Sequence, residues 1–126
     1  MNRKQRRLPD WIEDIRCAIE NIKEDTKGLT KARFLDDGKS QRAVAKSISD
    51  IGEAANRVME LVPEIEQRRP DIWKHFVGAY RSRNILVHDY FLIDAEIVWN
   101  TIESYLPQLE ELLDSVAKDQ PPGEPL

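Results

Sequence analysis

Apolar residues recur every three or four positions along most of this chain, and this spacing is the strongest constraint on its fold. Between Gln41 and Val62 the apolar side chains fall within about a third of a helical wheel, which predicts one long amphipathic helix. No segment alternates apolar and polar residues as a half-buried strand does. The chain is therefore expected to be all-α. The apolar positions of the long helix are Val44, Ile48, Ile51, Ala55, Val58, Met59 and Val62.

The residues before this long helix also carry helix signals. Asp10, with Glu13 three residues later, predicts a capping box that opens a first helix, which should run to about Thr26. Thr30–Leu35 can form one short helix, and the glycine-containing run Asp36–Ser40 is typical of a turn. Two helices are thus expected before the long one. Within the long helix, "IGEAAN" offers a glycine and two alanines where another helix can approach closely.

Two more helices are expected in the second half of the chain. Pro63 ends the long helix, and Asp71 can cap the next one, Ile72-His88. A last helix starts at Asp94 and should bend at Pro107, because proline cannot donate the helical hydrogen bond. Helices joined by short connections favour an up-and-down antiparallel bundle of four to five helices.

A length of 126 residues suits one domain with a hydrophobic core. We expect the helical domain at residues 8–114, after a basic amino-terminal arm, 1–7. Residues 115–126 contain three prolines and one glycine and predict a disordered tail. No apolar stretch approaches the roughly 18 residues of a membrane span, and no apolar region follows the basic start, so neither a membrane protein nor a signal peptide is expected.

Charge and residue content indicate the compartment in which the protein works and exclude several kinds of site. The lone Cys17 cannot form an internal disulfide, so a surface thiol in the reducing cytoplasm is expected. A net charge of −4 disfavours a protein that holds nucleic acid by a broad basic surface. Two histidines and one cysteine are too few for a zinc site, and no glycine-rich phosphate loop is present, so no metal and no cofactor are predicted. Two local basic clusters stand out: Arg3, Lys4, Arg6 and Arg7, and Arg68, Arg69, Lys74, Arg81 and Arg83.

The stretch "RNILVHDYF", residues 83–91, places polar groups within an apolar helix. Asn84 and His88 are four residues apart, on the same side as an apolar line, whereas Ile85 and Leu86 point away from it. This end of the helix is thus apolar on both sides. Two explanations are open: a homodimer through Ile72-His88, or a helix that is central in a single bundle. The apolar line consists of Trp73, Val77, Tyr80 and Val87.

Arg83, Asn84 and His88 suit the cleavage of RNA without a metal ion. His88 can take the proton of a 2′-hydroxyl while Arg83 stabilises the charge on phosphorus, and Asn84 can orient either. On a regular helix Arg83 and His88 diverge by about 140°, so they cooperate only if the helix ends near His88 or a partner chain completes the site. The second His88 of a dimer can then protonate the leaving oxygen. The other explanation is a core histidine bonded to Asn84, without catalysis.

The same stretch resembles the Arg-x4-His-x-Tyr motif of the HepT-like HEPN proteins. The resemblance extends from about residue 8 to 114, in that family's order and spacing. The segments that carry it are "LPDWIEDIRCAIENIKEDTKGLT", "FLDD", "ISDIGEAANRV", "RRPDIWKHFVGAYRSRNILVHDYF" and "DAEIVWNTIESYLPQLEELL".

This resemblance implies an all-α HEPN bundle that dimerises, with a composite cleft made by the motif of both chains and higher oligomers among the expected assemblies. It implies a metal-independent RNase that is the toxin of a toxin–antitoxin pair, with tRNA among the candidate RNA substrates. Arg83 and His88 would be the catalytic pair and Asn84 a polar support. Tyr90 would be the tyrosine that a nucleotidyltransferase antitoxin modifies with AMP, which blocks the cleft by charge and bulk.

Two features bear on the activity of this particular chain. Asp89 lies beside His88 where many such motifs carry a small residue, and its carboxylate can favour the imidazolium or weaken phosphate binding. The acidic balance leads us to expect slow or substrate-selective cleavage. The alternative function is a non-catalytic helical dimer that binds a nucleotide or a nucleotidyltransferase partner.

Overall fold

The computed structural model describes residues 6–88 and 94–119, and within these ranges it contains helices and no strand. The prediction of an all-α bundle is confirmed. No helix in these ranges is long and apolar enough to cross a membrane. The elements are α1 (Leu8–Asp25), α2 (Lys31–Leu35), α3 (Gly38–Leu61), α4 (Ile65–Arg68), α5 (Pro70–His88), α6 (Ala95–Asn100), a π-helical segment (Thr101–Tyr105) and α7 (Leu106–Asp119).

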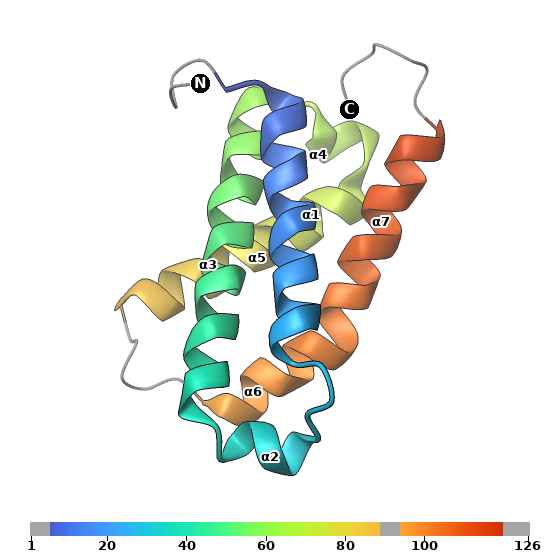
Figure 1. Ribbon diagram of the computed structural model, residues 1–126. Helices are drawn as coiled ribbons and strands as arrows, with labels where there is room; N and C mark the ends of the chain where they lie inside the picture. Colours follow the sequence, from blue (N-terminus) through green and yellow to red (C-terminus); the bar gives the residue numbers. More distant parts are fainter. Residues whose placement is uncertain (1–5, 89–93, 120–126) are drawn as a thin grey trace.

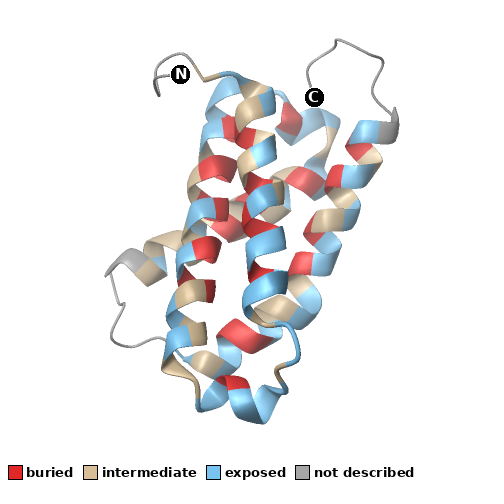
Figure 2. Cartoon of the chain, in the orientation of Figure 1, coloured by how far each residue is buried: buried red, intermediate tan, exposed pale blue. Residues whose placement is uncertain are grey.

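The bundle is built around α3, which packs most extensively against α1 and α5. Figure 1 shows α1 and α3 side by side along the length of the molecule, with α5 crossing behind them and α7 beside α1. The short helices α2 and α6 lie together at one end. Buried positions alternate with exposed ones along α1, α3 and α7, as expected of amphipathic helices around a single core (Figure 2). All seven apolar residues predicted for the long helix are buried: Val44, Ile48, Ile51, Ala55, Val58, Met59 and Val62.

Three helix starts differ from the sequence prediction. Helix α5 begins at Pro70, a residue suited to the first turn, so Asp71 lies inside the helix and does not cap it. Helix α1 begins at Leu8 and not after Asp10, because Pro9 suits the first turn of a helix and the Asp10 carboxylate accepts a 2.9 Å hydrogen bond from the Arg7 backbone N–H. Helix α3 begins at Gly38, within the predicted turn, because Asp37 caps it by accepting a 3.2 Å bond from the Ser40 N–H. This bond and, foremost, one from the Ser40 hydroxyl lower the pKa of Asp37.

The irregularity predicted at Pro107 takes the form of a π-helical segment directly before it. The Leu106 N–H donates to the Thr101 carbonyl, five residues back, so this turn is wider than an α-helical one. Proline has no N–H to donate, and its ring clashes with the preceding turn of a regular α-helix. A wider turn accommodates both features. Helix α7 then continues to Asp119, past residue 115, where the tail was expected to begin, and Val116 is buried.

Two ion pairs join α1 to α7 at the protein surface. Arg16 Nη1 lies 3.0 Å from Asp114 Oδ1, and Lys23 Nζ lies 2.7 Å from Glu110 Oε2. The Glu110 hydrogen bond is the largest cause of the raised pKa of Lys23. The later cation on α1 pairs with the earlier carboxylate on α7, so the two helices run antiparallel.

Tyr105 packs between α5 and the last helices. Its hydroxyl donates a hydrogen bond to the His75 carbonyl, and its ring stacks on the His75 imidazole with 5.0 Å between ring centroids. Burial raises the pKa of Tyr105 from 10.0 to about 12, because the charged phenolate would lose water.

We expect the raised pKa of Tyr105 to make the fold less stable in strong base. Between pH 10 and about 12 the unfolded chain releases this proton and the folded chain retains it, so the free energy of unfolding should fall by about 1–3 kcal/mol. Urea unfolding at a series of pH values measures this slope. Tyr105→Phe is the control: it should lower stability by about 1 kcal/mol at pH 8 and flatten the alkaline slope. An equal slope in both proteins would contradict the assignment.

Candidate active site on helix α5

Helix α5 carries the residues that the sequence singled out. Arg83 and Asn84 lie near its carboxyl end, and His88 is its last residue before residues 89–93. Asp89 and Tyr90 lie outside the described residues, so the expectations for them are not tested. The backbone therefore brings the Arg83–His88 stretch to one end of α5, close to where it crosses α3.

The side of α5 that faces the core is not the apolar line that the sequence singled out. Ile72, Phe76 and Ala79 are buried, whereas the predicted apolar line is only half-buried at Trp73, Val77 and Tyr80. Both lines of α5 are apolar, and spacing alone does not indicate which of them faces the core. Ile85 is 57% exposed, so α5 is not enclosed on all sides by the bundle. The helix thus presents a second, half-buried apolar line.

The Arg83 guanidinium is held by groups from two helices. Its Nη1 donates a 3.0 Å hydrogen bond to Asn84 Oδ1, and its Nη2 lies 3.6 Å from Glu53 Oε2 on α3. The guanidinium carbon also lies 5.9 Å from the centroid of the Tyr80 ring, within reach of a cation–π interaction. The side chain is 30% exposed, so it keeps access to solvent and to an anionic ligand.

Gly52 lets α3 and α5 approach each other at this point. A Cβ atom on residue 52 would lie 2.6 Å from the Ala79 carbonyl oxygen and would overlap the Arg83 Cβ. Only glycine fits such a crossing, which confirms the close approach that "IGEAAN" predicted. The backbone under Arg83 is therefore fixed against α3.

Sequence reasoning missed Glu53, which follows Gly52 directly. Its carboxylate bridges two arginines: Oε2 faces Arg83, and Oε1 lies 3.2 Å from Arg57 Nε. The only signal in the sequence was a carboxylate beside the predicted contact glycine. Arg83 is thirty positions further on, and one-dimensional spacing does not reveal which side chains of two crossing helices meet.

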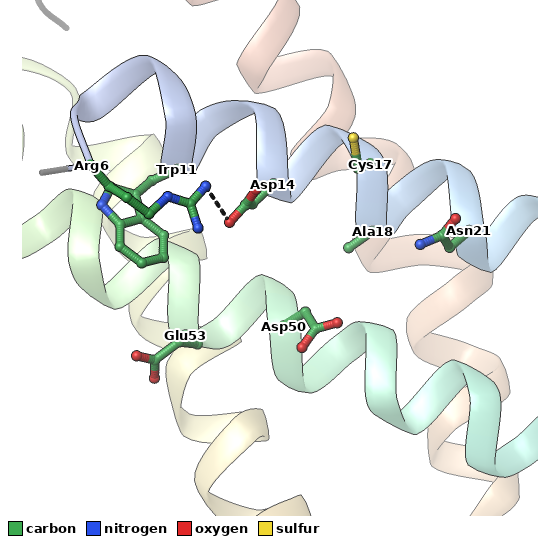
Figure 3. A pocket seen from close by; sticks show the side chains of 8 residues that line it. All are labelled: Arg6, Trp11, Asp14, Cys17, Ala18, Asn21, Asp50 and Glu53. Carbon is green, nitrogen blue, oxygen red and sulfur yellow. Dashed lines mark ion pairs between the residues drawn. The ribbon is translucent and has the colours of Figure 1, made fainter. Parts of the chain in front are cut away.

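A groove of about 340 Å³ lies between α1 and α3, and Glu53 is one of the residues that line it. Figure 3 shows Arg6 lying over the Trp11 ring and paired with Asp14. The Arg6 guanidinium is 4.1 Å from the ring centroid, and its Nη2 is 2.7 Å from Asp14 Oδ2; hydrogen bonding to Asp14 raises the pKa of Arg6. The groove is lined by Arg6, Trp11, Asp14, Cys17, Ala18, Asn21, Asp50 and Glu53.

Metal-ligating side chains do not gather in the part of the chain that the structure describes. No group of three His, Cys, Asp or Glu residues there could hold a metal ion. Cys17 is exposed, as expected, and its thiol donates a 3.5 Å hydrogen bond to the Glu13 carboxylate, the first cause of its raised pKa.

Comparisons with known proteins agree with this architecture. The family model described as "Ribonuclease HepT-like" matches residues 15–116. A protein of Thermococcus cleftensis named "Probable ribonuclease HepT" is 33% identical over 110 residues, which cover 86% of this chain and 94% of that protein. A protein of Methanocaldococcus jannaschii whose name assigns it to the RNases is 32% identical over 110 residues, covering 86% of each chain. No solved structure matches the chain significantly.

Proposed function

Because the chain belongs to the HepT-like ribonuclease family, we propose that it is a metal-independent endoribonuclease that acts in the cytoplasm as the toxin of a toxin–antitoxin pair. The observation that carries the proposal is the Arg83 guanidinium, held by Asn84 and Glu53 while still accessible, five residues before His88 on α5. A permanent cation and a group that titrates near neutral pH are what cleavage of an RNA phosphodiester needs without a metal.

In the proposed reaction the 2′-hydroxyl oxygen of RNA attacks the adjacent phosphorus. His88 accepts the hydroxyl proton, and Arg83 stabilises the negative charge that develops on the phosphoryl oxygens. The bond from phosphorus to the 5′-oxygen breaks, and that oxygen receives a proton from the second His88 of a dimer. The products are a 2′,3′-cyclic phosphate and a 5′-hydroxyl, so this step consumes no water.

The dimer in this proposal forms through α5. Trp73, Val77 and Tyr80 are only half-buried, which leaves an apolar line on the helix that carries Arg83. A second copy packed on this line by two-fold symmetry would bury that surface and bring both catalytic stretches together. Assemblies of more than two chains would extend from this dimer.

Neutralisation is proposed to occur at Tyr90. A nucleotidyltransferase antitoxin would transfer AMP to its hydroxyl, two residues after His88. Each added phosphate carries negative charge, which repels the RNA backbone, and the nucleotide occupies the space where RNA would bind. The proposal rests on the family and on the position of Tyr90 in the sequence, "HDYF".

Cleavage of total RNA and tRNA in the presence of a chelator tests the function. Protein whose intact mass shows an unmodified Tyr90 should cleave RNA with EDTA present. His88→Ala should lower the rate by at least about 10²-fold, because it removes the proton acceptor and donor, while its circular dichroism stays that of the wild type. If the unmodified wild type and His88→Ala are equally inert, the enzyme proposal fails, and a non-catalytic dimer that binds a nucleotide or a nucleotidyltransferase becomes the better account.

A further inference from the structure

We propose that Glu53 positions the Arg83 guanidinium for cleavage, an inference that rests on the proposed function. Glu53 comes from α3, whereas every residue of the predicted site lies on α5 or just after it. Its Oε2 is 3.6 Å from Arg83 Nη2, which is too long for a hydrogen bond and within the range of an ion pair. Glu53 therefore acts on Arg83 through its charge.

The Glu53 carboxylate is itself held in place. Arg57 Nε lies 3.2 Å from its Oε1, one helical turn along α3, and the adjacent Gly52 fixes the distance between α3 and α5. A carboxylate anchored in this way can attract one edge of the guanidinium while Asn84 accepts from Nη1. Of the five N–H groups of Arg83, the hydrogen bond to Asn84 uses one, so donors remain for a phosphate. The guanidinium is thereby oriented before RNA binds, which avoids a reorganisation during the reaction.

A second account of the same ion pair predicts the opposite result. If Glu53 only offsets the charge of Arg83, removing the carboxylate should strengthen attraction to RNA and should not slow cleavage. If Glu53 orients Arg83, removal should slow the chemical step even though RNA binds as well or better. The turnover rate and the affinity for uncleaved RNA therefore separate positioning from simple neutralisation.

Glu53→Gln is the variant that tests the inference, because it removes the charge and keeps the shape. Glu60→Gln is the matched control: Glu60 is a carboxylate on the same helix, pairs with Arg57 Nη1 at 3.1 Å, and is exposed. Three quantities are measured on unmodified protein: kcat and KM with an RNA oligonucleotide, the Kd for its 2′-O-methyl analogue, which cannot be cleaved, and the thermal unfolding midpoint.

We expect Glu53→Gln to lower kcat at least about tenfold, with the Kd of the methylated RNA unchanged or tighter and with the midpoint close to that of Glu60→Gln. An unchanged or raised kcat would overturn the inference, and so would a fall in kcat explained by weaker RNA binding or by unfolding. The failure of the proposed function looks different: wild type that does not cleave, or Arg83→Ala that cleaves as well as wild type, overturns both proposals. Active wild type, inert Arg83→Ala and unaffected Glu53→Gln overturn this inference alone.

Discussion

Replacing Gly52 by alanine is expected to lower the free energy of unfolding by about 2 kcal/mol and to abolish most RNA cleavage. The added Cβ would lie 2.6 Å from the Ala79 carbonyl oxygen, so α3 and α5 must move apart. Overpacking of this kind typically costs about 1–3 kcal/mol, and the better helix propensity of alanine offsets at most about 1 kcal/mol of it. Cleavage should fall further than stability alone explains, because Arg83 lies at the contact and moves with α5. Urea unfolding and the RNA assay measure the two effects.

Gly78→Ala is the control for this prediction. Gly78 lies on α5, one residue before Ala79, and a Cβ there would be 3.4 Å from the Tyr105 hydroxyl, close to an ordinary contact. This variant should stay within about 1 kcal/mol of the wild type and keep its cleavage, since alanine suits a helix better than glycine does. If Gly52→Ala and Gly78→Ala have equal free energies of unfolding and equal cleavage rates, α3 and α5 are not in close contact at Gly52.

Arg83→Lys is expected to lower kcat by about 10²-fold although it preserves the positive charge. The planar guanidinium has separate N–H groups for Asn84 Oδ1, for Glu53 and for a phosphate. Lysine has one compact ammonium group and cannot make these three contacts together. Losing one oriented donor to a developing negative charge typically costs 10²–10³-fold in rate. Single-turnover cleavage of an RNA oligonucleotide measures the loss.

Arg81→Lys serves as the matched control, because Arg81 is exposed, lies on the same helix and is two residues away. It should cleave RNA at the rate of the wild type and with the same salt dependence, because lysine keeps the positive charge. Comparable rates for Arg83→Lys and wild type would mean that charge alone suffices at residue 83 and that the guanidinium geometry is not used.

The sequence predicted the elements of this fold better than it predicted their contacts. Periodicity placed the long helix, the seven apolar positions that it predicted are all buried, and Gly52 marked the helix crossing. Periodicity could not choose between the two apolar lines of α5, because the choice depends on where α3 and α7 lie. The start of α1 was placed late, because Asp10 is not the cap. It is the third residue after the cap Arg7 and accepts a bond from the Arg7 backbone N–H.

The contacts of Arg83 show the same difference between local and long-range prediction. Arg83 and Asn84 are neighbours in the chain, so their association needed only local reasoning. Glu53 joins them across two helices, and this contact depends on the angle and the separation at which α3 meets α5. The wide turn before Pro107 was expected only as a bend, since proline identifies the broken hydrogen bond and not the way in which the chain compensates for it.

The two ion pairs between α1 and α7 have a consequence for how the sequence can change. Exposed pairs such as Arg16–Asp114 and Lys23–Glu110 add little stability, but they fix the position of α7 along the axis of α1. Sliding α7 by one turn would leave one of these cations without its carboxylate. Reversing one charge alone places like charges together, whereas reversing both charges of a pair restores the attraction. Substitutions at these four positions are therefore expected to be accepted as compensating exchanges, so that residues 16 and 114, and residues 23 and 110, co-vary among homologous chains.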